Sequence, residues 1–114
     1  MAKALYSVHV IGAAGRNIIL LYIGDGCIAG IDVGAGKYRG TTETLPNGGL
    51  RAALDLTVTP GTPLITGAVA PAGMSTIAIK FELPPDFAQG SRVIAISTPI
   101  GQVNARFEKL IDLA

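Results

Sequence analysis

The chain has few of the residues on which most protein chemistry depends. It contains one cysteine, one histidine and no tryptophan, and only 15% of its residues are charged. A single cysteine excludes an intramolecular disulfide and any zinc site built from several cysteines. The formal net charge of +1 argues against a protein that binds nucleic acid by neutralising phosphates, so we expect no nucleic-acid partner.

Long apolar runs are also missing. The longest strictly apolar run covers residues 18–23, whereas a helical membrane span needs about 20 apolar residues. The first residues enter an alternating segment directly and lack the apolar core of a signal peptide. We therefore predict a soluble, cytoplasmic protein with no membrane partner.

What the chain does contain favours strands and turns. Apolar residues make up 49% of its 114 residues, and glycine and proline contribute 15 and 7 residues. This length is enough for one domain, residues 1–114, with a hydrophobic core that needs no disulfide or metal. Apolar and polar residues alternate over residues 50–59, 76–83 and 103–108. Alternation with a period of two is typical of half-buried antiparallel strands.

Turn residues separate these alternating runs. Asp25-Gly26 has the composition of a tight hairpin turn, and Pro46-Asn47-Gly48-Gly49 offers residues that tolerate positive φ. Further turns are expected at residues 84–86 and 99–101. The apolar segment 60–75 contains three prolines and three glycines. It is expected either to form a short extra strand or to fold over the mouth of a barrel.

The pattern predicts an all-β fold with eight strands. The expected strands cover residues 4–11, 17–24, 26–31, 37–45, 49–59, 76–83, 91–98 and 102–109. No segment has the apolar stripe of a helix, although residues 85–89 are compatible with one helical turn. Eight antiparallel strands with short connections indicate an up-and-down barrel or a sandwich. We prefer the barrel, of the lipocalin or calycin type, because closure removes exposed sheet edges.

Two glycine motifs resemble phosphate-binding loops without meeting their requirements. Gly12-Ala13-Ala14-Gly15 follows a strand, but the β-branched run at Ile18 replaces the helix that a dinucleotide-binding turn needs. Gly34-Ala35-Gly36-Lys37 lacks the first glycine and the hydroxyl residue of a P-loop. Both are interpreted as hairpin turns or loops, and we expect no cofactor.

No catalytic constellation is visible either. His9 is the only histidine, and no acidic or nucleophilic residue lies at a sequence spacing that would indicate a catalytic pair with it. Cys27 has no cationic neighbour that would lower its pKa, and we expect it to be a buried structural thiol. The carboxylates and the cations are dispersed along strands and turns, as on solvated strand faces. The sequence therefore predicts no catalytic residue, no metal site and no enzymatic activity.

The first half of the chain resembles a known family. The residues are Leu5-Tyr6-x-Val8, then residues 24–32 (Gly-Asp-Gly-x-Ile-x-Gly-x-Asp), then Tyr38-x-Gly40. These motifs, within residues 4–59, resemble the GrlR-like family of small negative regulators of type III secretion. The resemblance implies a dimeric, lipocalin-type eight-stranded barrel with an interior suited to an apolar ligand. The family regulator binds its activator through an acidic loop, where this chain has only Thr41-Thr42-Glu43-Thr44.

These observations lead to two hypotheses on function. The first is a non-enzymatic binding or regulatory barrel whose partner is a small apolar ligand or a protein. The barrel interior would be lined by Tyr6, Val8, Leu54, Leu56, Ile79, Phe81 and Phe107, whether it is filled by these side chains or hollow. The alternative is a structural protein that acts through its homodimer surface. A homodimer is expected because residues 18–23 are apolar on both faces, whereas a barrel has only one interior.

Overall fold

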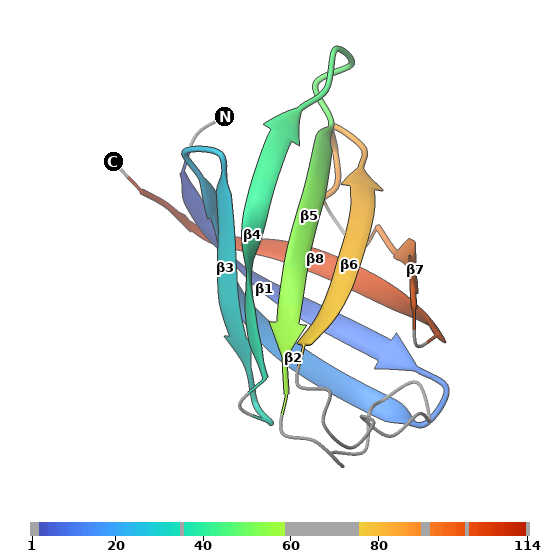
Figure 1. Ribbon diagram of the computed structural model, residues 1–114. Coiled ribbons are helices and arrows are strands. Elements are labelled where there is room, and N and C mark those ends of the chain that lie inside the picture. Colours follow the sequence, from blue (N-terminus) through green and yellow to red (C-terminus); the bar gives the residue numbers. More distant parts are fainter. Residues whose placement is uncertain (1–2, 35, 59–75, 90–91, 100, 114) are drawn as a thin grey trace.

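The computed structural model describes residues 3–34, 36–58, 76–89, 92–99 and 101–113. Eight strands and no helix occur in this part of the chain (Figure 1). The strands are β1 (Ala4–Gly12), β2 (Gly15–Gly24), β3 (Cys27–Asp32), β4 (Lys37–Thr44), β5 (Leu50–Thr57), β6 (Thr76–Leu83), β7 (Ile94–Thr98) and β8 (Gly101–Asp112). No helix among the described residues is long and apolar enough to cross a membrane.

All eight strands belong to one antiparallel sheet that curves into a nearly closed barrel. The strand order is β6-β5-β4-β3-β2-β1-β8-β7, so every pair except β1 and β8 consists of neighbours in sequence. The two ends of the sheet, β6 and β7, face each other across the remaining opening (Figure 1), and no ladder joins them in the described residues. The predicted up-and-down barrel is confirmed.

The predicted turns are confirmed wherever the structure describes them. Asp25 and Gly26 have φ values of 54° and 73°, which is the geometry of a type I′ hairpin. Gly48 has a φ of 86°, and the Asn47 carboxamide oxygen accepts a hydrogen bond from the Gly49 amide at 2.8 Å. After β6, the Phe87 amide bonds to the Pro84 carbonyl at 3.1 Å. The expectations for residues 60–75 lie outside the described residues.

The last strand is longer than the sequence predicts. β8 was expected to end at residue 109 but continues to Asp112, and the Leu113 amide then donates to the Lys3 carbonyl at 2.7 Å. An irregularity in the pairing of β1 with β8 lies between Leu5 and Tyr6. It shifts the alternation, so that Ile111 stands opposite Leu5 on the outside of the barrel. Such an irregularity has no clear signature in the sequence.

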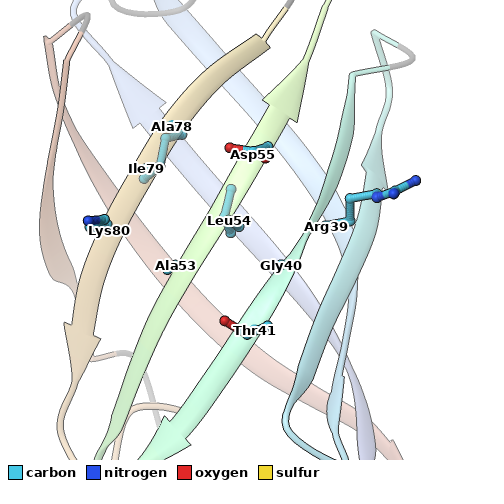
Figure 2. Close-up of a pocket in the computed structure, with 9 residues that line it drawn as sticks. All are labelled: Arg39, Gly40, Thr41, Ala53, Leu54, Asp55, Ala78, Ile79 and Lys80. Atoms are coloured by element: carbon cyan, nitrogen blue, oxygen red, sulfur yellow. The ribbon is translucent and has the colours of Figure 1, made fainter.

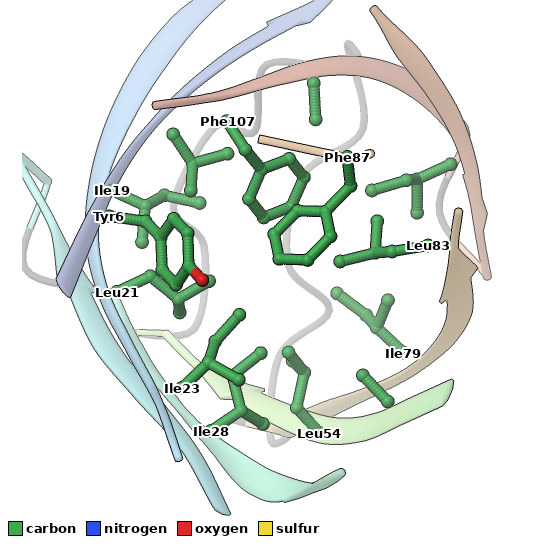
Figure 3. Packing of buried hydrophobic residues seen from close by; sticks show 14 of the residues in the cluster. Tyr6, Ile19, Leu21, Ile23, Ile28, Leu54, Ile79, Leu83, Phe87 and Phe107 are labelled. Atoms are coloured by element: carbon green, nitrogen blue, oxygen red, sulfur yellow. The ribbon is translucent and has the colours of Figure 1, made fainter. Parts of the chain in front are cut away.

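The core lies inside the barrel and is entirely apolar. Alternate residues of each strand point inward, as the burial pattern of β5 illustrates from Leu50 to Leu56. No polar or charged residue is buried in the described part of the chain. Figure 3 shows inner side chains converging from strands on all sides of the barrel. Burial of this apolar surface is the main force that closes the sheet.

Cys27 contradicts the expectation of a buried thiol. It is exposed at the start of β3, and the next residue, Ile28, is the one that faces the core. Apolar neighbours in the sequence indicate a strand, but they do not indicate which of its two faces points inward. The position of Cys27 follows from the register with β2 and β4, where it pairs with Gly24 and Thr41.

Gly40 allows β4 and β5 to lie close together. A Cβ atom built on Gly40 would overlap the Ala53 carbonyl oxygen and would lie 2.5 Å from the Leu54 Cα atom. Both obstacles are backbone atoms, which cannot move away without disturbing the ladder. Glycine at this position therefore permits close packing in the barrel wall.

We expect Gly40→Ala to lower the free energy of unfolding by about 1–3 kcal/mol, because overpacking against backbone atoms strains the sheet. Urea denaturation followed by circular dichroism measures the change. Gly34→Ala is the matched control, since its Cβ would meet only the Asp32 carboxylate, at 3.4 Å. An equal effect of the two substitutions would contradict the close approach of β4 and β5.

Candidate functional site

The barrel interior is the first candidate site. The seven residues predicted to line it come from β1, β5, β6 and β8, and the fold brings all of them to the inner face of the sheet. Six of them are buried, and the seventh, Phe81, is partly buried and packs against the same cluster. The six are Tyr6, Val8, Leu54, Leu56, Ile79 and Phe107.

The two ends of the interior differ in accessibility. At the end where β2 meets β3, Ile23 and Ala52 are 0% exposed and Leu50 is 1% exposed. Toward the opposite end, Leu54 is 7% exposed and Ile19 is 8% exposed. The values rise in this direction along β2 and β5, whereas Val8 on β1 is only 2% exposed and Ile77 on β6 is less exposed, at 4%, than Ile79. The interior is therefore enclosed at one end and more accessible at the end that contains the β1–β2 and β3–β4 turns.

An aromatic cluster fills part of the interior. Phe87 stacks at an angle of 44° on Tyr6, with ring centroids 5.4 Å apart, and it meets Phe107 edge-on at 5.3 Å. Figure 3 shows the Phe87 and Phe107 rings side by side within the barrel. Sequence analysis missed Phe87 because it belongs to the turn after β6 rather than to an alternating strand. Its only signal is a large apolar residue within a proline-rich turn.

A hydrogen-bonded pair lies at the rim of the more accessible end. The Tyr38 hydroxyl donates to the Asp32 carboxylate at 2.7 Å, and the Gly34 and Gly36 amides donate to the same carboxylate at 2.9 and 2.8 Å. Burial raises the pKa of Tyr38 far above its ordinary value, and the hydrogen bond and charge of Asp32 raise it further. Asp32 thus holds Gly34 and Gly36 of the predicted loop through their amides.

The second candidate site is a groove on the outside of the barrel. It has a volume of about 220 Å³ and lies over β4, β5 and β6. Its floor is formed by small residues such as Ala53 and Ala78, and Arg39, Asp55 and Lys80 stand around it (Figure 2). Sequence analysis considered these charges dispersed, and only the pairing of three strands brings them together. Asp55 stands directly opposite Arg39, so the negative charge partly neutralises the positive ones.

Catalytic chemistry finds no support among the described residues. His9 pairs with Ile18 and Arg106 across the sheet, and no carboxylate of the described chain forms an ion pair or hydrogen bond with it. No group of three metal-ligating side chains occurs in the described part either. Arg51 forms ion pairs with Glu43 and Glu82 at 3.0 and 3.2 Å on the exposed face of the sheet. These ion pairs join adjacent strands.

The raised pKa of Tyr38 predicts a loss of stability in alkaline solution. The unfolded chain releases the tyrosine proton near pH 10, whereas the folded protein retains it to higher pH. The free energy of unfolding should therefore fall as the pH rises above about 10. Tyr38→Phe should cost about 1 kcal/mol at pH 7 and make the alkaline decline shallower, as measured by urea denaturation at pH 7 and above pH 10.

Tyr22→Phe is the control for this measurement. The Tyr22 hydroxyl also faces a carboxylate, that of Asp25 at 3.4 Å, but it does so in an exposed turn. Its removal should change the alkaline slope less than that of Tyr38. An identical slope for the wild type and for Tyr38→Phe would contradict the assignment.

Comparisons with known proteins give no further guide to the site. Neither protein-family models, nor curated proteins, nor solved structures match this chain. The resemblance to GrlR-like regulators stays a prediction from the motifs within residues 4–59. The function has to be argued from the interior, the groove and the outer surface of the barrel.

Proposed function

We propose that this protein is a non-enzymatic binding and regulatory barrel that holds a small apolar molecule in its interior. The observation that carries the proposal is the unequal accessibility of the two ends. Leu54 and Ile19 retain 7–8% of their surface, whereas Ile23 and Leu50, nearer the other end of the same two strands, retain 0–1%. A core that served stability alone would gain from enclosure at both ends.

The chemistry of the interior favours an apolar ligand. Among the described residues, the inner face presents aliphatic and aromatic side chains and no buried charge. A small barrel of eight strands is just wide enough to hold one small ligand. Transfer of an apolar molecule from water to these surfaces is favourable in proportion to the area buried. The ligand would enter the barrel interior at the end that contains the β1–β2 and β3–β4 turns.

Features of the sequence support a regulatory, cytoplasmic and non-enzymatic role. The resemblance to GrlR-like regulators supports a lipocalin-like binding role in regulation, with the barrel rather than an acidic loop as the shared feature. A single exposed cysteine is compatible with the reducing conditions of the cytoplasm. His9, without a carboxylate partner in the described chain, supports the assignment of a non-enzymatic role.

Binding of the neutral fluorophore N-phenyl-1-naphthylamine tests this function. Wild-type protein should bind it saturably, and Leu56→Trp should weaken binding by at least about tenfold, because a larger side chain occupies the accessible half. Thr57→Trp is the matched control, since this neighbour is exposed on the outer face. Circular dichroism establishes that both variants fold, and Ile79→Phe on the neighbouring strand β6 provides a second test.

Native mass spectrometry of the purified protein gives an independent measurement. A retained apolar molecule, released on unfolding, is the expected result. Two outcomes would contradict the function: no saturable binding by the wild type, or equal binding by Leu56→Trp and Thr57→Trp.

A second candidate function, association of two copies, is favoured by an apolar patch on the outside of the barrel. Ile18 and Leu20 on β2, with Ile31 on β3, are 45–47% exposed. Leu20 pairs with Ile31, and both point away from the core. We call this patch the outer apolar face; its residues are Leu5, Ile18, Leu20, Tyr22, Ala29, Ile31 and Ile111.

A second copy of the chain fits the outer apolar face. The face spans four adjacent strands, from β8 to β3, and contains no charged residue. Two such faces related by a two-fold axis bring no like charges together, as a self-complementary interface requires. Sheet faces with aliphatic side chains pack well on one another. A highly charged partner would find no complementary group there.

We expect the wild type to be a dimer at micromolar concentration by light scattering. Leu20→Lys should give a monomer, because the new ammonium would be buried without a partner at the interface. Val93→Lys, at an exposed apolar residue outside the face, should leave the dimer intact. A monomeric wild type, or equal effects of the two substitutions, would exclude this association.

A further inference from the structure

Tyr6 is the only residue with a side-chain hydroxyl group among the buried residues of the described chain. It is 4% exposed, and its ring is held by the Phe87 ring. Figure 3 shows the Tyr6 hydroxyl oxygen directed inward, among aliphatic side chains. Tyr6 and its cross-strand partner Leu21 are equally exposed, and they lie between the enclosed end of the barrel and its more accessible half.

Within the part of the chain that the structure describes, the Tyr6 hydroxyl has no hydrogen-bond partner, which distinguishes it from the other two tyrosines. Tyr38 donates to Asp32 and Tyr22 donates to Asp25. No described residue forms a hydrogen bond with Tyr6, although buried tyrosine hydroxyls usually find a partner. No fully enclosed polar side-chain atom of the described residues lacks a partner. The Tyr6 hydroxyl therefore borders accessible space, from which a partner can reach it.

The charges near Tyr6 indicate what kind of partner fits. Burial raises the pKa of Tyr6, the Lys109 ammonium opposes this rise, and Asp112 adds to it. The hydroxyl consequently keeps its proton at neutral pH and can donate it to an acceptor. Lys109 stands opposite Tyr6 on β8, but its ammonium is already paired with Asp112 at 3.1 Å. A buried carboxylate would find no free cation there, so a neutral acceptor is favoured.

We propose that the Tyr6 hydroxyl anchors a ligand that combines a hydrocarbon body with one neutral hydrogen-bond acceptor, such as a ketone, aldehyde or ester carbonyl. The inference rests on the proposed function, because the body of the ligand would lie in the accessible half among Leu54, Leu56 and Ile79. Val10 lies four residues after Tyr6 along β1, a distance of about 13 Å in a strand. This length suits an extended hydrocarbon chain.

Two probes of similar shape test the inference, 2-undecanone with a carbonyl and undecane without one. Their affinities are measured by displacement of N-phenyl-1-naphthylamine. The wild type should bind the ketone about tenfold more tightly than the alkane, the gain expected for one hydrogen bond in an apolar site. Tyr6→Phe should abolish this preference and leave the affinity for undecane unchanged.

Tyr38→Phe is the matched control, because its hydroxyl is committed to Asp32, and it should retain the preference for the ketone. If Tyr6→Phe does not fold, the infrared carbonyl band of the ketone bound to wild-type protein replaces it. A shift of this band to lower frequency supports a hydrogen bond, and an unshifted band contradicts it.

The outcomes distinguish failure of the Tyr6 anchor from failure of the proposed binding function. Equal affinity of the wild type for ketone and alkane overturns the anchor but leaves an apolar binding barrel in place. Tighter binding of undecanoate than of 2-undecanone overturns the preference for a neutral acceptor. If neither the fluorophore nor the two probes bind, the proposed function itself fails.

Discussion

The alternation of side chains across paired strands is the constraint on which this structure depends. A barrel wall is one sheet thick, so each residue of a strand faces either the interior or the outside. Apolar residues from every strand except β4 form the buried core, and their burial draws the sheet around it. The inner positions of β4 are Tyr38, Gly40 and Thr42. The last opening, between β6 and β7, is not joined by a ladder in the described residues. Phe87, from the turn after β6, packs into the core with Tyr6 and Phe107.

The exposure of side chains varies along the interior of the barrel, and the polarity of side chains varies around its outside. Inside, one end is enclosed by tightly packed side chains, and Tyr6 marks the boundary with the more accessible half. Outside, the face over β4, β5 and β6 has charged residues around a shallow groove, whereas the outer apolar face on β2 and β3 presents exposed aliphatic side chains such as Leu20 and Ile31. The two inequalities are independent of each other, since the wall separates them. An interior ligand and an outer partner can therefore coexist on one small barrel.

Much of the fold follows from local patterns. The runs around β5 and β6 alternate strictly, and turn residues such as Asp25 and Gly26 determine where hairpins reverse. The predicted interior residues follow from the same alternation, because a two-residue period assigns each residue to a face. Where the alternation is ambiguous, the sequence fails, as for Cys27 at the start of β3. It fails also for Phe87, whose inward position depends on a turn and not on a strand.

By itself, the sequence determined the number of strands, their antiparallel order and most of the inner residues, because these depend on neighbours in the chain. Only the tertiary structure decided which residues of different strands meet. The register between β1 and β8 turns Ile111 outward and sets Lys109 opposite Tyr6. The pairing of β4, β5 and β6 gathers Arg39, Asp55 and Lys80 around one groove. These contacts depend on the register between paired strands, which composition and periodicity do not specify.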